Sequence, residues 1–308
     1  MKLQRLPLYD CLCLAVCCPF ILAQPGVPMK VKLPLCGCVL AAALLAAPTA
    51  GQAQEQAPAL LPLWEIGGVG LAMSQQAYPG ASQNVSRGLA LPYLIYRGKY
   101  LRADRESVGL RAFSTPQFEL DVGFAAAFGS RSDEVDARRG MPDLGTLVEF
   151  GPRLKWHLGQ GPANGRLRAE FALRGVFDLD DRLSHKGISF EPRLIYEWQG
   201  SGGWSYGTNV GAVMGNRRLA DTYYGVAPAY ALPGRPAYAA ESGLINWRLG
   251  LNVSRDMTPN LRLFGFAWFD SVAGAANRAS PLVQRTAGTS VGVGLTYTFA
   301  RSATLVRD

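Results

Sequence analysis

The fold of this chain is clearest in residues 291–299, which read VGVGLTYTF. Large apolar side chains occupy every second position from Val291 to Phe299, and glycine or threonine fills the positions between them. Successive side chains of a β-strand point to opposite faces, so this period of two puts one apolar and one small, polar face on a strand. The C-terminal region is therefore predicted to be a β-strand with one apolar face.

The same alternation recurs upstream. Residues 245–254 place Ile245, Trp247 and Leu249 on one face, and residues 166–177 and 188–198 oppose apolar side chains to charged ones. Further stretches of this kind are 64–73, 87–97, 117–128, 145–158, 204–214 and 261–270. The sequence thus predicts an all-β chain in which many strands share one design.

Strand length and charge placement favour a membrane barrel over a soluble sheet. Each stretch has about ten residues, which is the length a tilted strand needs to cross the hydrocarbon layer. A sheet in lipid must satisfy every backbone polar group internally, so it closes into a barrel that is apolar outside and tolerates charge inside. The side chains expected to face this lumen are Glu119, Asp121, Glu149, Arg153, Lys155, Arg168, Glu170, Arg174, Glu191, Arg193, Glu197 and Arg248. Trp64, Trp198, Trp204 and Trp268 are expected to form an interfacial girdle.

Connections alternate between short and long, as in outer-membrane barrels. Short turns are expected at 97–99, 159–165, 200–203 and 256–260, and longer loops at 75–86, 130–144, 178–186, 223–242 and 271–288. Short turns should face the periplasm. If residues 99–113 add a short up-and-down pair, the single antiparallel barrel of residues 63–299 has about 12 strands; if they fold in the lumen or along the rim, it has ten.

The N-terminal region is typical of an exported protein. Residues 29–53 combine Lys30 and Lys32, an apolar stretch and small residues before a favoured cleavage point after Ala53, which is the order of a signal peptide. Residues 1–28 are superfluous to this signal, so translation is expected to start at Met29. A lipid-attachment box ending at Cys38 is the alternative, but Cys38 precedes the apolar stretch instead of following it. Residues 54–62 are expected to be a linker.

Composition argues against several classes of function. All six cysteines lie in the first 38 residues, so a disulfide framework is excluded for the body of the chain. The formal net charge is +8. The sequence contains no cluster of Lys and Arg interleaved with aromatic residues, so nucleic-acid binding is not expected. The chain has two histidines, His157 and His185, which leaves little choice for the base of a hydrolase. We expect neither enzyme activity, nor a cofactor, nor a metal site at Asp178, Asp180, Asp181 and His185.

Several motifs resemble the MipA/OmpV family of MltA-interacting, Gram-negative outer-membrane barrels. The closing GLTYTF of residues 294–299 and ASPL of residues 279–282 are similar to this family over about residues 63–299. The most distinctive segment comprises Tyr223, Tyr224, Gly225, Val226, Arg235, Pro236, Tyr238, Ser242 and Gly243. Residues 300–308 are a departure, because family members usually stop at the terminal aromatic residue that the assembly machinery reads.

The resemblance implies a non-enzymatic scaffold in the outer membrane, surrounded by its lipid and lipopolysaccharide. It implies a lytic transglycosylase and a penicillin-binding protein as partners, which would couple cutting of peptidoglycan to its synthesis. A narrow channel for small solutes is the alternative. The lumen separates the two hypotheses, because full compensation of Arg153, Arg168, Arg174, Arg193 and Arg248 by carboxylates predicts a closed barrel, whereas an uncompensated basic ring predicts anion conductance.

Overall fold

The computed structural model describes residues 60–98, 101–103, 108–110 and 113–307. The predicted signal peptide, its cleavage site and most of the linker lie outside these residues. In chain order the strands are β1 (Leu60–Pro62), β2 (Trp64–Gln76), β3 (Asn84–Arg97), β4 (Leu101–Ala103), β5 (Val108–Leu110), β6 (Phe113–Ser114), β7 (Phe118–Ala127), β8 (Leu147–Gln160), β9 (Arg166–Asp178), β10 (Ser184–Gln199), β11 (Trp204–Gly215), β12 (Gly243–Asp256), β13 (Leu261–Ser271), β14 (Ala287–Arg301) and β15 (Leu305–Arg307). The helices are α1 (Arg217–Tyr224) and the short 3-10 turns η1 (Ser132–Glu134), η2 (Asp136–Arg138), η3 (Pro162–Asn164), η4 (Ser201–Gly203) and η5 (Pro228–Tyr230).

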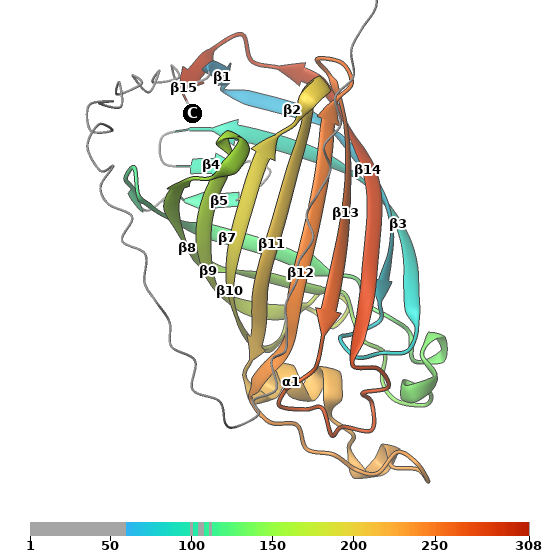
Figure 1. The fold of residues 1–308 in the computed structure, drawn as a ribbon. Helices are drawn as coiled ribbons and strands as arrows, with labels where there is room; N and C mark the ends of the chain where they lie inside the picture. Colours follow the sequence, from blue (N-terminus) through green and yellow to red (C-terminus); the bar gives the residue numbers. More distant parts are fainter. Residues whose placement is uncertain (1–59, 99–100, 104–107, 111–112, 308) are drawn as a thin grey trace, which may run out of the picture. The chain divides into compact units, whose positions relative to one another are not determined.

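The main sheet is antiparallel and curls back on itself (Figure 1). Neighbouring strands follow the order β5-β4-β3-β2-β14-β13-β12-β11-β10-β9-β8-β7-β6. The last long strand, β14, pairs with the first, β2, and β5 at one end of the order lies beside β7, the last strand but one at the other end. This arrangement confirms the predicted all-β antiparallel architecture. Within the described residues, no helix is long and apolar enough to span a membrane.

The predicted strands are all present, and the segment at 99–113 contributes short ones. Ten long strands, β2, β3 and β7 to β14, carry the sheet. Between β3 and β7, the described parts of residues 99–113 form β4, which pairs with β3, β5, which pairs with β4, and the first residue of β6, which pairs with β7. Counting β4 and β5 but not the two-residue β6 gives the predicted 12 strands, and counting only the long strands gives the alternative ten.

The outer face of the sheet is apolar, as the alternation predicts. In β14 the outward side chains of Val291, Val293, Leu295 and Phe299 are between 48% and 69% exposed, whereas inward Ser290 is buried. Ile245 departs from its expected outward position, because it is only 1% exposed. A β-bulge between Val213 and Met214 shifts the pairing of β11 with β12 beside Ile245, which then packs beneath the loops.

Connections of the two kinds gather at opposite ends of the barrel. The end where β3 meets β4, β8 meets β9, β10 meets β11 and β12 meets β13 has short connections, and we call it the turn end. At the loop end, residues 128–146, 216–242 and 272–286 are long, as expected, but residues 179–183 are as short as a turn. In Figure 1 the turn end lies at the top, beside β1 and β15, and the loop end lies at the bottom, beside α1.

The long loops pack into a small hydrophobic core of their own, which we call the loop cap. Its fully buried members include Tyr78, Val135, Tyr224, Val226 and Leu282, drawn from four different connections. The Tyr78 hydroxyl donates to the Leu282 carbonyl at 2.8 Å, and the Tyr224 hydroxyl donates to the Pro79 carbonyl at 3.1 Å. These buried hydroxyls therefore tie the loops together as well as filling the core.

Candidate functional site in the barrel interior

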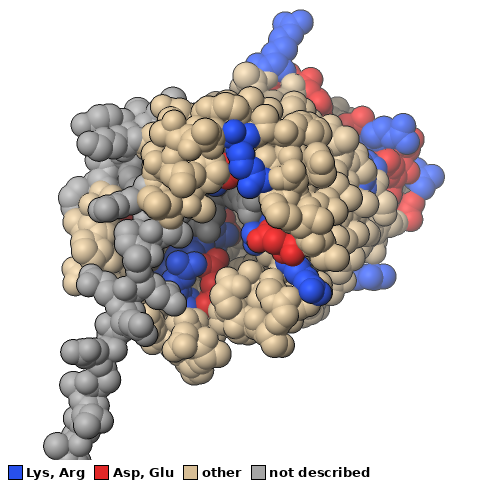
Figure 2. All heavy atoms as spheres, turned by 90° about the horizontal axis from the view of Figure 1, so that it is seen from above, with Lys and Arg blue, Asp and Glu red and all other residues tan. Residues whose placement is uncertain are grey.

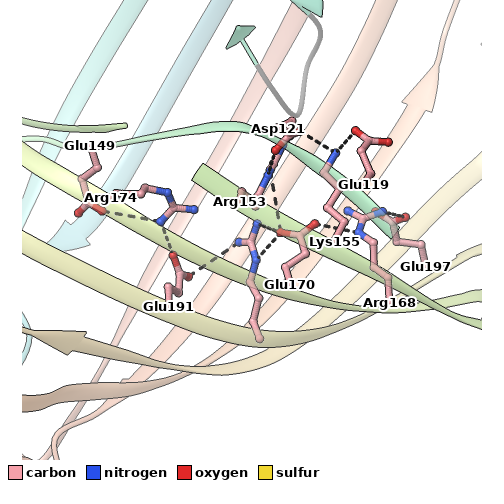
Figure 3. Close-up of polar contacts among 11 residues, drawn as sticks. Glu119, Asp121, Glu149, Arg153, Lys155, Arg168, Glu170, Arg174, Glu191 and Glu197 are labelled. Atoms are coloured by element: carbon pink, nitrogen blue, oxygen red, sulfur yellow. Dashed lines mark hydrogen bonds and ion pairs between the residues drawn. The ribbon is translucent and has the colours of Figure 1, made fainter. Parts of the chain in front are cut away.

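A belt of ion pairs crosses the inner wall of β7 to β10 at mid-height, and Glu170 lies at its centre (Figure 3). Glu170 is 0% exposed and faces three arginines: Arg193 at 2.5 Å, Arg168 at 2.9 Å and Arg153 at 3.9 Å. Register explains the first contact, because Arg193 of β10 lies directly opposite Glu170 of β9. Charged residues placed opposite each other on one face of a sheet meet across the strands.

The β7 side of the belt is built from two directly opposed pairs. Asp121 faces Arg153 and Glu119 faces Lys155 in the register of β7 with β8. Arg153 donates from Nε and Nη2 to both oxygens of Asp121, at 2.9 and 2.7 Å. Lys155 Nζ lies 3.3 Å from Glu119 and 3.2 Å from Asp121. A bidentate arginine fixes geometry as well as charge, so this corner of the belt is rigidly positioned.

Toward the loop end, two further groups continue the charge matching. Arg174, which is buried, lies 2.7 Å from Glu191 and 3.7 Å from Glu149. On the turn-end side of the belt, Arg168 also reaches Glu197 at 2.7 Å. Around the barrel, Arg248 of β12 donates to both oxygens of Asp270 of β13, at 2.7 and 2.9 Å. All five arginines named for the compensation test therefore contact carboxylates.

All 12 expected lumenal residues lie on the inner face within these ion pairs, namely Glu119, Asp121, Glu149, Arg153, Lys155, Arg168, Glu170, Arg174, Glu191, Arg193, Glu197 and Arg248. The sequence reasoning missed Asp270, the partner of Arg248. It also placed Trp268 wrongly, because this side chain points inward and lies under the Arg248 guanidinium, with 5.0 Å from Cζ to the ring centroid. Period two gives the reason, since Trp268 shares its face with Asp270.

The family-signature loop forms part of the loop cap. Tyr223 and Tyr224 end helix α1, which the sequence analysis did not anticipate, although Asn216 is a helix-capping residue and accepts from Leu219 N. Val226 bridges Tyr238 in an antiparallel pair. Gly225 lies where a Cβ would meet Asp221, and Gly243 at the start of β12 has φ +145°. Pro236 and Ser242 are exposed.

Arg235 is the polar tie of this signature loop. It is 9% exposed, and its guanidinium donates to backbone carbonyls of Tyr230, Ala137 and Arg139. These acceptors belong to two different connections, residues 128–146 and 216–242. A planar guanidinium can serve several carbonyls at once, so Arg235 holds the two loops in register.

The polar loop with His185 is not arranged as a catalytic triad. The Ser184 hydroxyl donates to Asp181 at 2.6 Å, whereas the His185 ring packs against Phe177, with centroids 5.3 Å apart and the ring planes tilted by 57°. Hydrogen bonds from Ser184 and Lys186 hold the pKa of the exposed Asp181 carboxyl below its usual range. Across the part of the chain that the structure describes, no group of three His, Cys, Asp or Glu side chains is placed to hold a metal ion.

Two cavities flank the belt. The larger, at the turn end, has a volume of about 930 Å³, and Figure 2, which looks onto this end, shows a hollow with basic and acidic side chains around it. We call it the basic vestibule; its charged lining residues are Arg97, Lys155, Arg166, Arg168, Arg262, Arg301, Glu65, Glu119 and Asp256, with His157 beside them. A smaller chamber of about 230 Å³ lies between the belt and the loop cap, lined by Tyr223, Trp268 and Arg248 among others.

Solved outer-membrane barrels share a general likeness with this chain. Outer membrane phospholipase A from Escherichia coli is 15% identical, with a TM-score of 0.33, over 77% of this chain and 94% of that one. OprB from Pseudomonas putida is 9% identical, with a TM-score of 0.35, over 77% and 94%. An outer membrane channel from Pseudomonas putida F1 is 11% identical, with a TM-score of 0.35, over 80% and 98%. No curated protein is significantly similar in sequence.

Family membership rests on the sequence itself. A family model described as MltA-interacting protein MipA matches residues 67–299. The match begins within β2 and ends within β14, so it includes the charged belt, the loop cap and most of the vestibule lining. It also agrees with the resemblance seen over residues 63–299, and with the apolar outer face it supports an outer-membrane barrel. The chain therefore belongs to the family of the MltA-interacting protein MipA.

Proposed function

We propose that this protein is a non-enzymatic scaffold of the outer membrane that brings a lytic transglycosylase and a penicillin-binding protein together at its periplasmic end. The name of the family describes an interaction with MltA, and the short connections of the turn end are those that face the periplasm in outer-membrane barrels. The observation that carries the proposal is the compensated belt. Each belt arginine contacts a carboxylate, which favours a filled interior over a selective pore.

The loop cap supports the same proposal. Its buried core lies across the loop end, and the smaller chamber separates it from the belt. A solute entering from the loop end would meet apolar packing first and then matched charges. Desolvating those matched charges or separating them is costly, so the interior is built for stability and not for passage.

Photo-cross-linking in cells tests the scaffold directly. A photoreactive residue at exposed Ser201, in the turn end, should form adducts with the transglycosylase and the penicillin-binding protein, detected by antibodies against each enzyme. The same residue at exposed Ala239, in the loop end, is the matched control and should give no adduct with either. Absence of both adducts from Ser201 would overturn the proposal.

Conductance separates the scaffold from the narrow channel. The protein, purified from outer membranes of cells that express the full chain, is inserted into a planar bilayer beside an Arg153→Ala variant. We expect both to be silent, with folding checked by the heat-dependent gel shift of barrels. Discrete events in the parent protein that change amplitude or selectivity in Arg153→Ala would favour the channel and contradict the scaffold.

A further inference from the structure

The basic vestibule carries more positive than negative charge. Its lining includes six lysines and arginines but only three carboxylates. Three of the cations are matched within the lining: Arg97 with Glu65 at 2.7 Å, Lys155 with Glu119 at 3.3 Å and Arg262 with Asp256 at 3.5 Å. Arg168 is taken up by carboxylates of the belt. The surplus is therefore concentrated on the remaining two arginines.

Those two are Arg166 and Arg301, which form no ion pair with any residue that the structure describes. The Arg301 guanidinium is held by the Pro259 carbonyl and the Asn260 side-chain oxygen, both neutral acceptors. Arg166 is exposed at the start of β9. Unlike the belt arginines, these cations keep their charge available to a ligand that enters the vestibule.

A β-bulge aims Arg301 into the vestibule. Odd-numbered residues of β14 up to Phe299 face outward, so simple alternation would put Arg301 on the lipid side as well. The register shift between Thr298 and Ala300 brings Arg301 opposite Glu65 of β2, whose side chain lines the cavity. A second bulge, between His157 and Gly159, adjoins Arg166 at Gln160. Bulges at a barrel rim commonly re-aim side chains toward a site.

Besides the charged residues, the lining contains both apolar side chains and neutral polar ones such as Thr258, Thr296 and Thr298. Leu61, Pro62, Ile95 and Leu261 share the cavity with the cations. Its volume of about 930 Å³ is near the upper end of the range for ligand pockets, enough for a short extended segment. A bare phosphate polymer would use the cations alone, whereas a peptide that alternates carboxylates and apolar side chains would use both.

We propose that the basic vestibule is the binding site for an extended acidic peptide segment of a periplasmic partner protein. This inference rests on the proposed scaffold function and adds to it the chemistry by which a partner is recognised. Carboxylates of the segment pair with Arg166 and Arg301, and its apolar side chains contact Leu61 and Leu261. Rim charges of this kind raise the association rate and make binding sensitive to salt.

Peptide binding measured by fluorescence anisotropy tests the site. The protein is expressed from the full chain and purified in detergent. The probe is a labelled peptide of alternating Glu and Leu, and its comparison is the same peptide with Gln in place of Glu. The double change Arg166→Glu and Arg301→Glu should lower the affinity for the Glu peptide by about tenfold, because two attractions between opposite charges become repulsions. Arg278→Glu with Arg285→Glu, exposed at the loop end, makes the same change in net charge and should leave affinity unchanged.

Three results would contradict the acidic-peptide site. Equal binding of the Gln peptide, equal weakening by the loop-end variant, or binding of inorganic polyphosphate but not of the Glu peptide would overturn the acidic-peptide site. The Ser201 cross-link separates this failure from that of the scaffold. If the Glu peptide does not bind but the enzyme adducts persist, only this inference falls; if the adducts are absent too, the scaffold falls with it.

Discussion

One carboxylate, Glu170, is the shared ion-pair partner of three arginines in the barrel interior. It is fully buried, and three arginines from β8, β9 and β10 share its two oxygens. Replacing Glu170 with glutamine keeps the shape but removes the negative charge. The arginines would then be left close together without full compensation, and breaking a buried pair costs about 3–5 kcal/mol.

We therefore expect Glu170→Gln to lower the midpoint of urea unfolding in lipid vesicles by an amount equivalent to several kcal/mol. Glu197→Gln is the matched control, because the Glu197 side chain is 31% exposed and its one ion pair among the described residues is with Arg168. Arg168 keeps Glu170 as its partner after this change, and a partly exposed pair contributes about 1 kcal/mol or less, so the unfolding midpoint of Glu197→Gln should move little. Equal shifts for the two variants would contradict the central role given to Glu170.

Gly151 offers a test of packing between strands. A Cβ at Gly151 would lie 2.2 Å from the Leu173 carbonyl oxygen and 2.9 Å from Arg174 Cα, both backbone atoms that cannot swing aside. Gly151→Ala should therefore destabilise the barrel by about 1–3 kcal/mol, measured by the temperature of its heat-dependent gel shift. Gly70→Ala is the control, since no atom lies within 4 Å of its added Cβ. A larger effect at Gly70 would disprove the argument.

Alternation along each strand predicted which side chains face inward, but not which side chains they contact on neighbouring strands. It identified Glu170 and Arg193 separately, whereas their contact depends on the register of β9 with β10, which single strands do not encode. Trp268 was misplaced for another reason. A tryptophan near a strand end suits a membrane interface, and only its shared face with Asp270 indicates the interior.

At the scale of elements, the loop cap should respond to alkaline pH. Burial raises the pKa of Tyr78 to about 12, so the folded state holds this proton more tightly than the unfolded chain, whose tyrosines titrate near 10. The stability that Tyr78 provides is therefore complete below pH 10 and is lost as the pH rises through about 12. Burial raises the pKa of Tyr224 in the same direction.

Ultraviolet difference titration should detect a late tyrosinate step near pH 12, accompanied by loss of the near-ultraviolet circular dichroism of the cap. Tyr78→Phe should remove part of that late absorbance step. Tyr206→Phe, on the outer face of β11, should leave it in place. A titration in which Tyr78→Phe alters only the ordinary step would contradict the burial of this hydroxyl.

Long strands were predictable as elements, whereas α1 and the bulges were not. Strands such as β14 repeat one pattern over many residues. Helix α1 has only 8 residues, which is too short for a helical pattern to stand out within a long connection. The bulge after Thr298 follows from backbone pairing with β2, so alternation alone places Arg301 on the wrong face.

For the whole molecule, the loop cap and the belt act as barriers in series. Replacing residues 217–240 by a short glycine linker should remove α1 and much of the cap, yet the barrel should stay silent in a planar bilayer because the belt remains. Combining this deletion with Arg153→Ala should produce measurable current. Conductance from the deletion alone would show that the belt does not block the interior.

The pairing of β1 with β15 brings the two described ends of the chain together. Leu60 lies opposite Arg307 and Pro62 opposite Leu305, and this ribbon continues at the turn end beside Arg97, which donates to the Pro62 carbonyl. Termini that lie side by side allow circular permutation. A gene in which residues 60 and 307 are joined and new ends open at Gly234 in the cap should still encode the same barrel, with its order of synthesis rotated but its order of neighbours unchanged.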